Sequence, residues 1–141
     1  MPRTLIVDAN PLLSALLGGA ALPILCDPGF RFLTAEKTTW EVKRYIPTIV
    51  EKLKAAGKTA WTEARLERRF HQLPVAAFGD DFYGSFLPEA RRLIGQRDPE
   101  DVDLLALTLH TKLPLWTEDR DFDSIPEIVV VRTSELIEVQ R

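Results

Sequence analysis

The chain has 141 residues, of which 45% are hydrophobic and 28% are charged, and we expect residues 1–141 to form one domain with a hydrophobic core. Its net charge of −3 argues against a strongly basic coat for nucleic acid, and its single cysteine excludes an intrachain disulfide and a cysteine-built zinc site. The sequence shows neither an apolar stretch long enough to span a membrane nor a signal peptide, so we expect a cytoplasmic protein.

Short apolar runs alternate with amphipathic segments along the chain. Strands are predicted at residues 3–8, 30–34, 75–78, 113–117 and 128–131. Helices are predicted at residues 10–17, 35–56, 59–71, 80–95 and 98–111, with a turn or helix at 134–139. This alternation indicates an α/β fold in which helices cover both faces of a parallel sheet.

Local signals predict helix boundaries and buried faces. Asn10 is predicted as the N-cap of the first helix, with Pro11 at its first position and Gly18-Gly19 at its end. Apolar residues at helical spacing are expected to face the core, and these are Trp40, Val42, Ile46, Ile49, Val50, Leu53, Phe82, Phe86, Ala90, Leu93 and Ile94. The segment 98–111 is apolar almost all round, which predicts a helix buried against the sheet.

Acidic residues stand where several apolar runs meet a turn or a helix end. They are Asp8, Glu41, Asp101 and Asp119, with Asp121 close behind. Carboxylates that converge without a cation repel one another and lose solvation, so a fold that gathers them favours a divalent metal ion. A metal ion with open water positions indicates phosphate-ester chemistry. The alternatives are that Asp8 assists a helix cap and that Glu41 is a solvated helical residue.

The segment Asp98-Pro99-Glu100-Asp101 has the form of a helix start. Asp98 is predicted as the N-cap, and Asp101 resembles the reciprocal partner of a capping box. At about 100° per residue, Asp103 lies roughly 200° around a regular helix from Asp101, so both cannot reach one small site. We therefore choose Asp101 as the site residue and expect Asp103 in a salt bridge or in solvent.

The segment Thr117-Glu118-Asp119-Arg120-Asp121 follows a predicted strand. In an extended chain Thr117, Asp119 and Asp121 face one way, with the other two side chains opposite. Three polar groups on one side at the carboxyl end of a strand are typical of a binding site. An Asp-rich surface turn is the alternative interpretation.

Taken in order, four segments resemble the PIN domain, in particular the VapC-type ribonuclease toxins and their close relatives. The segments are Asp8-Ala9-Asn10, Trp40-Glu41, Asp98-Pro99-Glu100-Asp101-Val102-Asp103-Leu104-Leu105-Ala106-Leu107 and Pro114-Leu115-Trp116-Thr117-Glu118-Asp119-Arg120-Asp121-Phe122. Together they span nearly the whole chain, and the two C-terminal segments are the most specific.

The resemblance implies a three-layer α/β/α sandwich around a parallel sheet and a nuclease that cuts RNA with Mg²⁺ or Mn²⁺. It places the family's catalytic and metal-binding acids on this chain, with a further set of auxiliary residues. The acids are Asp8, Glu41, Asp101 and Asp119, and the auxiliary residues are Asp121, Asn10 and Thr117. For a toxin, the resemblance also implies a cognate antitoxin protein and a homodimer.

The lysines and arginines of the 35–71 region make this region net basic. Basic helix faces are usually just solvated, so this gives weak support to RNA binding.

Other functions fit the sequence less well. A haloacid-dehalogenase-like phosphatase also begins with a strand-borne Asp, but it needs a second Asp where Asn10 stands. A catalytically silent PIN-like domain that binds RNA or protein is the serious alternative. Retention of every expected carboxylate favours an enzyme.

Overall fold

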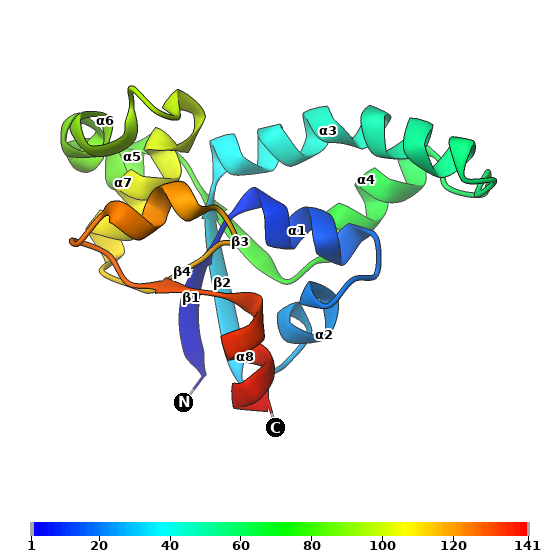
Figure 1. Ribbon diagram of the computed structural model, residues 1–141, viewed down its shortest axis with the longest axis horizontal. Helices are drawn as coiled ribbons and strands as arrows, with labels where there is room; N and C mark the ends of the chain where they lie inside the picture. Colours follow the sequence, from blue (N-terminus) through cyan, green and yellow to red (C-terminus); the bar gives the residue numbers. More distant parts are fainter. Residues whose placement is uncertain (1, 141) are drawn as a thin grey trace.

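The computed structural model describes residues 2–140, in which strands and helices alternate as the sequence predicts (Figure 1). The elements, with η for a 3₁₀ helix, are β1 (Arg3–Val7), α1 (Ala9–Leu16), α2 (Ala21–Leu25), β2 (Phe30–Ala35), α3 (Glu36–Ala55), α4 (Glu63–Gln72), β3 (Val75–Phe78), α5 (Asp80–Tyr83), η1 (Gly84–Phe86), α6 (Leu87–Ile94), η2 (Pro99–Asp101), α7 (Val102–Thr111), β4 (Leu115–Trp116), η3 (Arg120–Ser124), β5 (Val130–Val131) and α8 (Thr133–Gln140).

The five strands within residues 2–140 form one parallel sheet in the order β3-β2-β1-β4-β5. The chain builds outward from β1 to β2 and β3, and then returns to place β4 and β5 on the other side of β1. Because all the strands are parallel, their carboxyl ends share one edge. The order reverses between β1 and β4, and open parallel sheets bind ligands at such a reversal.

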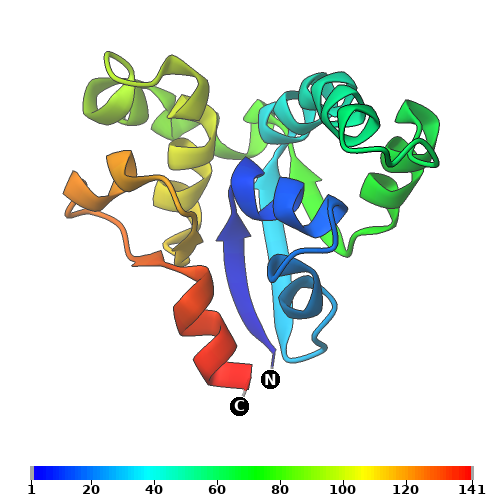
Figure 2. The same ribbon diagram turned by 45° about the vertical axis from the view of Figure 1, so that its right-hand side comes forward.

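Helices cover both faces of the sheet, which confirms the predicted three-layer α/β/α fold (Figures 1 and 2). Helices α1, α2, α3, α4 and α8 pack on one face, and α5, α6 and α7 pack on the other. Side chains alternate along β1, so that Leu5 and Val7 join the first core cluster and Ile6 joins the second. The central strand is therefore buried on both sides.

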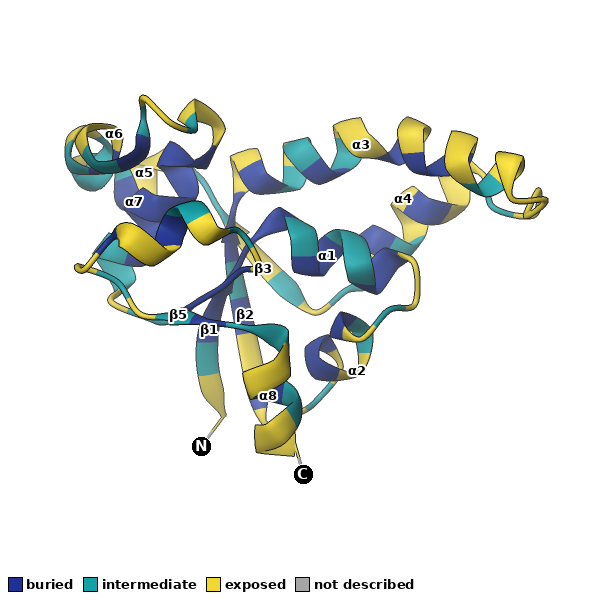
Figure 3. Ribbon diagram, in the orientation of Figure 1, coloured by how far each residue is buried: buried dark blue, intermediate teal, exposed yellow. Residues whose placement is uncertain are grey.

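Helix α7 is buried along most of its length, as its apolar sequence predicts (Figure 3). Residues 102–108 are all buried, including the polar side chains of Asp103 and Thr108. The helix packs against α6 and β2, and its first residue follows directly on η2. Among residues 2–140, no helix combines the length and the apolar character needed to cross a membrane.

Several predicted boundaries differ from the structure. Helix α2 was not predicted, and the predicted helix at 80–95 is divided into α5, η1 and α6. Pro88 explains part of this division, because a residue without a backbone N–H fits the first turn of α6 and not the interior of a longer helix. Helix α4 begins at Glu63 because the Thr62 hydroxyl caps it, accepting from the Arg65 N–H at 3.1 Å.

Two aromatic residues that we expected to face the core are exposed. Trp40 is 54% exposed and Phe82 is 42% exposed. The Phe82 ring packs at the surface against Phe78 and His110, with centroids 4.8 and 4.6 Å away. Helical spacing identifies the apolar face of a helix. Whether a residue at the margin of that face is buried depends on the elements that pack against it.

Leu105 is fully buried in α7, between the sheet and α6. Leu105→Ala should lower the free energy of unfolding by about 2–5 kcal/mol, because it removes buried apolar surface and leaves a cavity. Val139 of α8 is 58% exposed and is the control, for which Val139→Ala should change stability by less than about 0.5 kcal/mol. Urea denaturation measures both variants, and equal effects would contradict the central position of α7.

Candidate metal centre

Asp8 lies buried at the carboxyl end of β1. Its backbone N–H donates to the carbonyl oxygen of Trp116 at 3.0 Å, which extends the pairing of β1 with β4. Its carboxylate is fixed at both oxygens, since Oδ1 accepts from the Ala9 N–H at 2.6 Å and Oδ2 accepts from the Thr117 hydroxyl at 2.6 Å. The fold therefore determines where this charge points.

Asp8, and not Asn10, is the N-cap of α1, so the predicted capping role of Asn10 is wrong. The helix begins at Ala9, which leaves Asn10 inside its first turn. The side-chain oxygen of Asn10 instead accepts from the Glu118 N–H at 3.2 Å. Asn10 thus ties α1 to the loop after β4, which carries Asp119.

The loop after β4 is held by hydrogen bonds within it and by Arg132, which lies between β5 and α8. The Asp119 N–H donates to the Thr117 hydroxyl oxygen at 2.9 Å, and Asp119 Oδ1 accepts from the Asp121 N–H at 2.9 Å. Arg132 donates to the carbonyl oxygens of Thr117 and Asp119 at 2.6 and 3.4 Å. Because η3 begins at Arg120, the extended alternation predicted to continue to Asp121 ends at Asp119. Asp121 contacts Asp119 through its backbone.

Asp98, Asp101 and Asp119 form a compact group of carboxylates at the same edge of the sheet. Each offers one oxygen, and these oxygens lie within 4.8 Å of one another. Asp101 is only 6% exposed, and its Oδ2 has no hydrogen-bond partner among residues 2–140. A buried carboxylate oxygen without a partner is costly, so the donor set and the unpartnered atom fit a bound cation.

Asp98 occupies the predicted N-cap position of the helical segment that follows it, but its side chain does not cap that segment. Asp98 precedes η2, but its side chain makes no capping hydrogen bond, and no capping box with Asp101 forms in this described segment. The segment starts as one turn of 3₁₀ helix, in which residues three apart lie on the same side. Asp98 and Asp101 therefore point their carboxylates to the same place. Their spacing of three residues was the sequence signal for this.

The acids at this edge share one electrostatic environment. Burial raises the pKa of Asp8, and the charges of Asp119 and Asp98 raise it further. Burial also raises the pKa of Asp101 strongly, with added contributions from Asp98 beside it and from the charges of Asp8 and Asp119. Glu41 is farther out and half-buried. Burial, followed by the charge of Asp8, raises the pKa of Glu41 to about 7.

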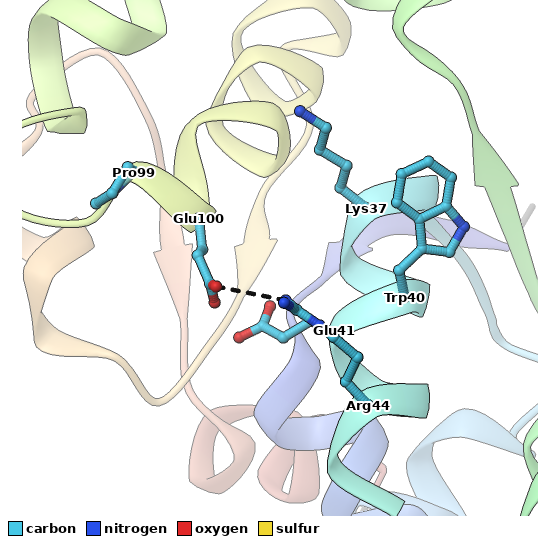
Figure 4. A pocket seen from close by; sticks show the side chains of 6 residues that line it. All are labelled: Lys37, Trp40, Glu41, Arg44, Pro99 and Glu100. Atoms are coloured by element: carbon cyan, nitrogen blue, oxygen red, sulfur yellow. Dashed lines mark hydrogen bonds and ion pairs between the residues drawn. The ribbon is translucent and has the colours of Figure 1, made fainter.

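The predicted site residues thus fall into two groups. Asp101 and Asp119 belong to the compact carboxylate group, and Asp8 is near enough for its charge to act on Asp101. Glu41 lines an adjoining hollow of about 390 Å³ between α3 and η2 (Figure 4). The residue that the sequence prediction missed is Asp98.

Asp103 lies away from this group. Its carboxylate accepts from the Tyr83 hydroxyl at 2.6 Å and pairs with Lys37 Nζ at 3.4 Å. The salt bridge is one of the two outcomes that we expected for Asp103. A rotation of roughly 200° about the helix axis accounts for its separation from Asp101.

The chain belongs to the PIN domain family, whose model matches it over residues 6–138. Two of the solved structures that share its fold illustrate the likeness. A chain of VapBC2 from Rickettsia felis, bound to a DNA fragment from the VapBC2 promoter, aligns with a TM-score of 0.62 and 11% identity over 92% of this chain and 98% of that chain. A chain of a toxin–antitoxin complex from Klebsiella pneumoniae aligns with a TM-score of 0.59 and 20% identity over 91% and 96%. No curated protein matches the sequence. The predicted family and fold are confirmed.

Asp101 should make the metal-free protein less stable as the pH rises. Its folded-state pKa is raised, so the folded protein holds a proton that the unfolded chain has lost, and stability falls as pH increases from about 4 toward the raised pKa. Asp101→Asn removes this titration and should stabilise the protein at pH 8 by about 1–3 kcal/mol. Thermal unfolding in EDTA at several pH values measures the effect.

Glu51→Gln is the matched control, because Glu51 is an exposed acid on α3. It should leave the pH dependence of the melting temperature unchanged. If Asp101→Asn melts at or below the wild-type temperature at pH 8, the buried Asp101 carboxylate does not destabilise the folded protein, and this prediction is wrong.

Proposed function

We propose that this protein is a divalent-metal-dependent endoribonuclease that hydrolyses RNA phosphodiester bonds and is the toxin of a toxin–antitoxin pair. The observation that carries the proposal is the group of Asp98, Asp101 and Asp119, with its unpartnered buried oxygen, at the reversal point of a parallel sheet. Membership of the PIN family supports a nuclease. In this proposal residues 1–141 act as one nuclease domain in the cytoplasm.

The carboxylates suit a hard cation, and we propose Mg²⁺ or Mn²⁺. Asp8, Asp101 and Asp119 are the assigned ligands, and Asp98 joins them because its oxygen lies within the same 4.8 Å group. Glu41 and Asp121 contribute directly or through water. When bound, the ion stabilises charge on the phosphate and lowers the pKa of a water molecule that attacks phosphorus.

The chain's own groups position these acids. The Thr117 hydroxyl and the Ala9 N–H hold the Asp8 carboxylate, and Asn10 and Arg132 hold the loop that carries Asp119. These contacts reduce the reorganisation that the site must undergo during the reaction. Glu41 borders the hollow, and burial together with the charge of Asp8 raises its pKa to about 7, so in the metal-free protein its carboxylate exchanges a proton near neutral pH.

The toxin assignment draws support from the fold that this chain shares with chains of two toxin–antitoxin complexes. It implies a cognate antitoxin protein and, as the resemblance suggests, a homodimer. A small gene beside this one should encode the antitoxin, whose product should copurify with the chain and suppress cleavage. Its absence would remove the toxin assignment and leave the nuclease assignment standing.

The purified protein should cleave single-stranded RNA with Mg²⁺ or Mn²⁺ and stop in EDTA. Asp8→Asn, Asp101→Asn and Asp119→Asn should each lower the cleavage rate by about a thousandfold, because each removes a charge that holds the ion. Gel assays with labelled RNA measure the rates, and circular dichroism checks the fold. Glu51→Gln should cleave at the wild-type rate. Full activity in Asp8→Asn or Asp101→Asn would remove this assignment.

Binding of the ion is measured separately from activity. Mn²⁺ at about 100 times its dissociation constant should stabilise the wild-type protein by about 2.7 kcal/mol, and it should stabilise Asp101→Asn far less. Thermal unfolding with and without Mn²⁺ gives both values. If RNA binds without cleavage and Mn²⁺ stabilises neither protein, the catalytically silent PIN-like domain is the correct interpretation.

A further inference from the structure

An exposed tryptophan borders the hollow that adjoins the proposed centre. Trp40 is 54% exposed and directly precedes Glu41 on α3. It borders the hollow of about 390 Å³, whose lining consists of Lys37, Trp40, Glu41, Arg44, Pro99 and Glu100 (Figure 4). Glu41, Pro99 and Glu100 connect this hollow with the acids, because Pro99 and Glu100 lie between Asp98 and Asp101 in η2. The indole therefore borders a hollow that adjoins the centre, and it is in contact with solvent.

Two cations flank the indole along the same helix. Lys37 lies three residues before Trp40 and Arg44 lies four residues after it, which is about one turn on either side. Their side chains are 58% and 68% exposed, so both cations are accessible from solvent. One stretch of α3 thus presents a cation, an aromatic ring and a second cation beside a cluster of carboxylates.

The two cations are held differently. Lys37 Nζ lies 3.4 Å from Asp103 Oδ1, and the side chain of Asp103 is 7% exposed and also accepts from Tyr83. This buried carboxylate orients Lys37. Arg44 pairs at 3.4 Å with Glu100, and both partners are exposed. Exposed pairs of this kind are weak, so the Arg44 guanidinium can exchange its partner for a phosphate.

Other aromatic residues near cations are arranged differently. Over the Trp61 ring lie the guanidinium groups of Arg65 at 4.3 Å and Arg69 at 5.6 Å, and over the Tyr45 ring lies Lys52 Nζ at 5.6 Å. Those rings already carry a cation on a face. Within residues 2–140, no such cation lies over Trp40, so its indole is open to a planar ligand.

We propose that the hollow binds one nucleotide of single-stranded RNA, whose base stacks on Trp40 while Lys37 and Arg44 contact the adjoining phosphates. This inference rests on the proposed nuclease function and specifies how its substrate is held. Any base can stack on an aromatic ring, and cations beside the ring can contact the phosphates that flank the base. The surface therefore favours unpaired RNA, whose bases are free to leave the strand's own stack, over duplex RNA.

The kinetic test uses Trp40→Ala with a short single-stranded RNA. The KM should rise by about tenfold to a hundredfold, as expected for loss of one stacked base, while kcat changes by less than about threefold. Trp40→Tyr keeps a stacking ring and should retain most of the affinity. Tyr45→Ala is the matched control, because Tyr45 is 44% exposed on the same helix but does not line the hollow, and its KM should stay unchanged.

A binding test separates the subsite from catalysis. In the non-cleaving Asp119→Asn variant, single-stranded RNA should quench tryptophan fluorescence, and the added change Trp40→Phe should abolish that quench. An oligonucleotide without bases should bind at least about tenfold more weakly to Asp119→Asn. Duplex RNA of the same length should give little quench.

The outcomes distinguish this inference from the nuclease proposal. Cleavage with an unchanged KM in Trp40→Ala, or a quench that persists without Trp40, overturns the subsite and leaves the nuclease standing. A quench that depends on Trp40, in a wild-type protein that does not cleave, supports the subsite and removes the nuclease. If Trp40→Ala weakens only the binding of a protein partner, the surface belongs to that partner and the RNA subsite is wrong.

Discussion

The hydrogen bond from the Thr117 hydroxyl to Asp8 joins residues 109 apart in the sequence, at the ends of two neighbouring strands. It extends the β1–β4 pairing past the last backbone bond, so the position of Asp8 and the start of the Asp119 loop are set together. Repulsion among buried carboxylates opposes this arrangement. Hydrogen bonds from Ala9 and Thr117 offset this repulsion at Asp8, and a hydrogen bond from Asp121 offsets it at Asp119. Asp101 Oδ2 has no hydrogen-bond donor among residues 2–140.

Asp8 and Asp119 could be located from the sequence because a parallel sheet gathers the carboxyl ends of its strands, whatever chain lies between them. The burial of α7 could also be predicted, since a helix that is apolar all round has no face suited to water. Asp103 could be separated from Asp101 because rotation about a helix axis is local geometry. Each of these predictions depended on regular structure alone.

Asn10 and Asp98 could not be placed correctly, because a short polar side chain takes its partner from tertiary neighbours. Asn10 accepts from Glu118, 108 residues away, and so does not cap its own helix. Asp98 was predicted to cap an α-helix. The segment instead starts as a 3₁₀ turn, and the carboxylate of Asp98 lies near that of Asp101. Trp40 fits the apolar spacing of α3, yet the neighbouring elements leave 54% of it exposed.

Arg132 has a consequence for the newly made protein. Its guanidinium holds the carbonyl oxygens of Thr117 and Asp119 and also binds the Asp123 carboxylate, and it follows all the acids of the centre in chain order. A ribosome makes the chain from its amino end, so the Asp119 loop emerges before the group that secures it. On the nascent polypeptide these two carbonyl oxygens therefore lack their guanidinium partner until Arg132 has left the exit tunnel.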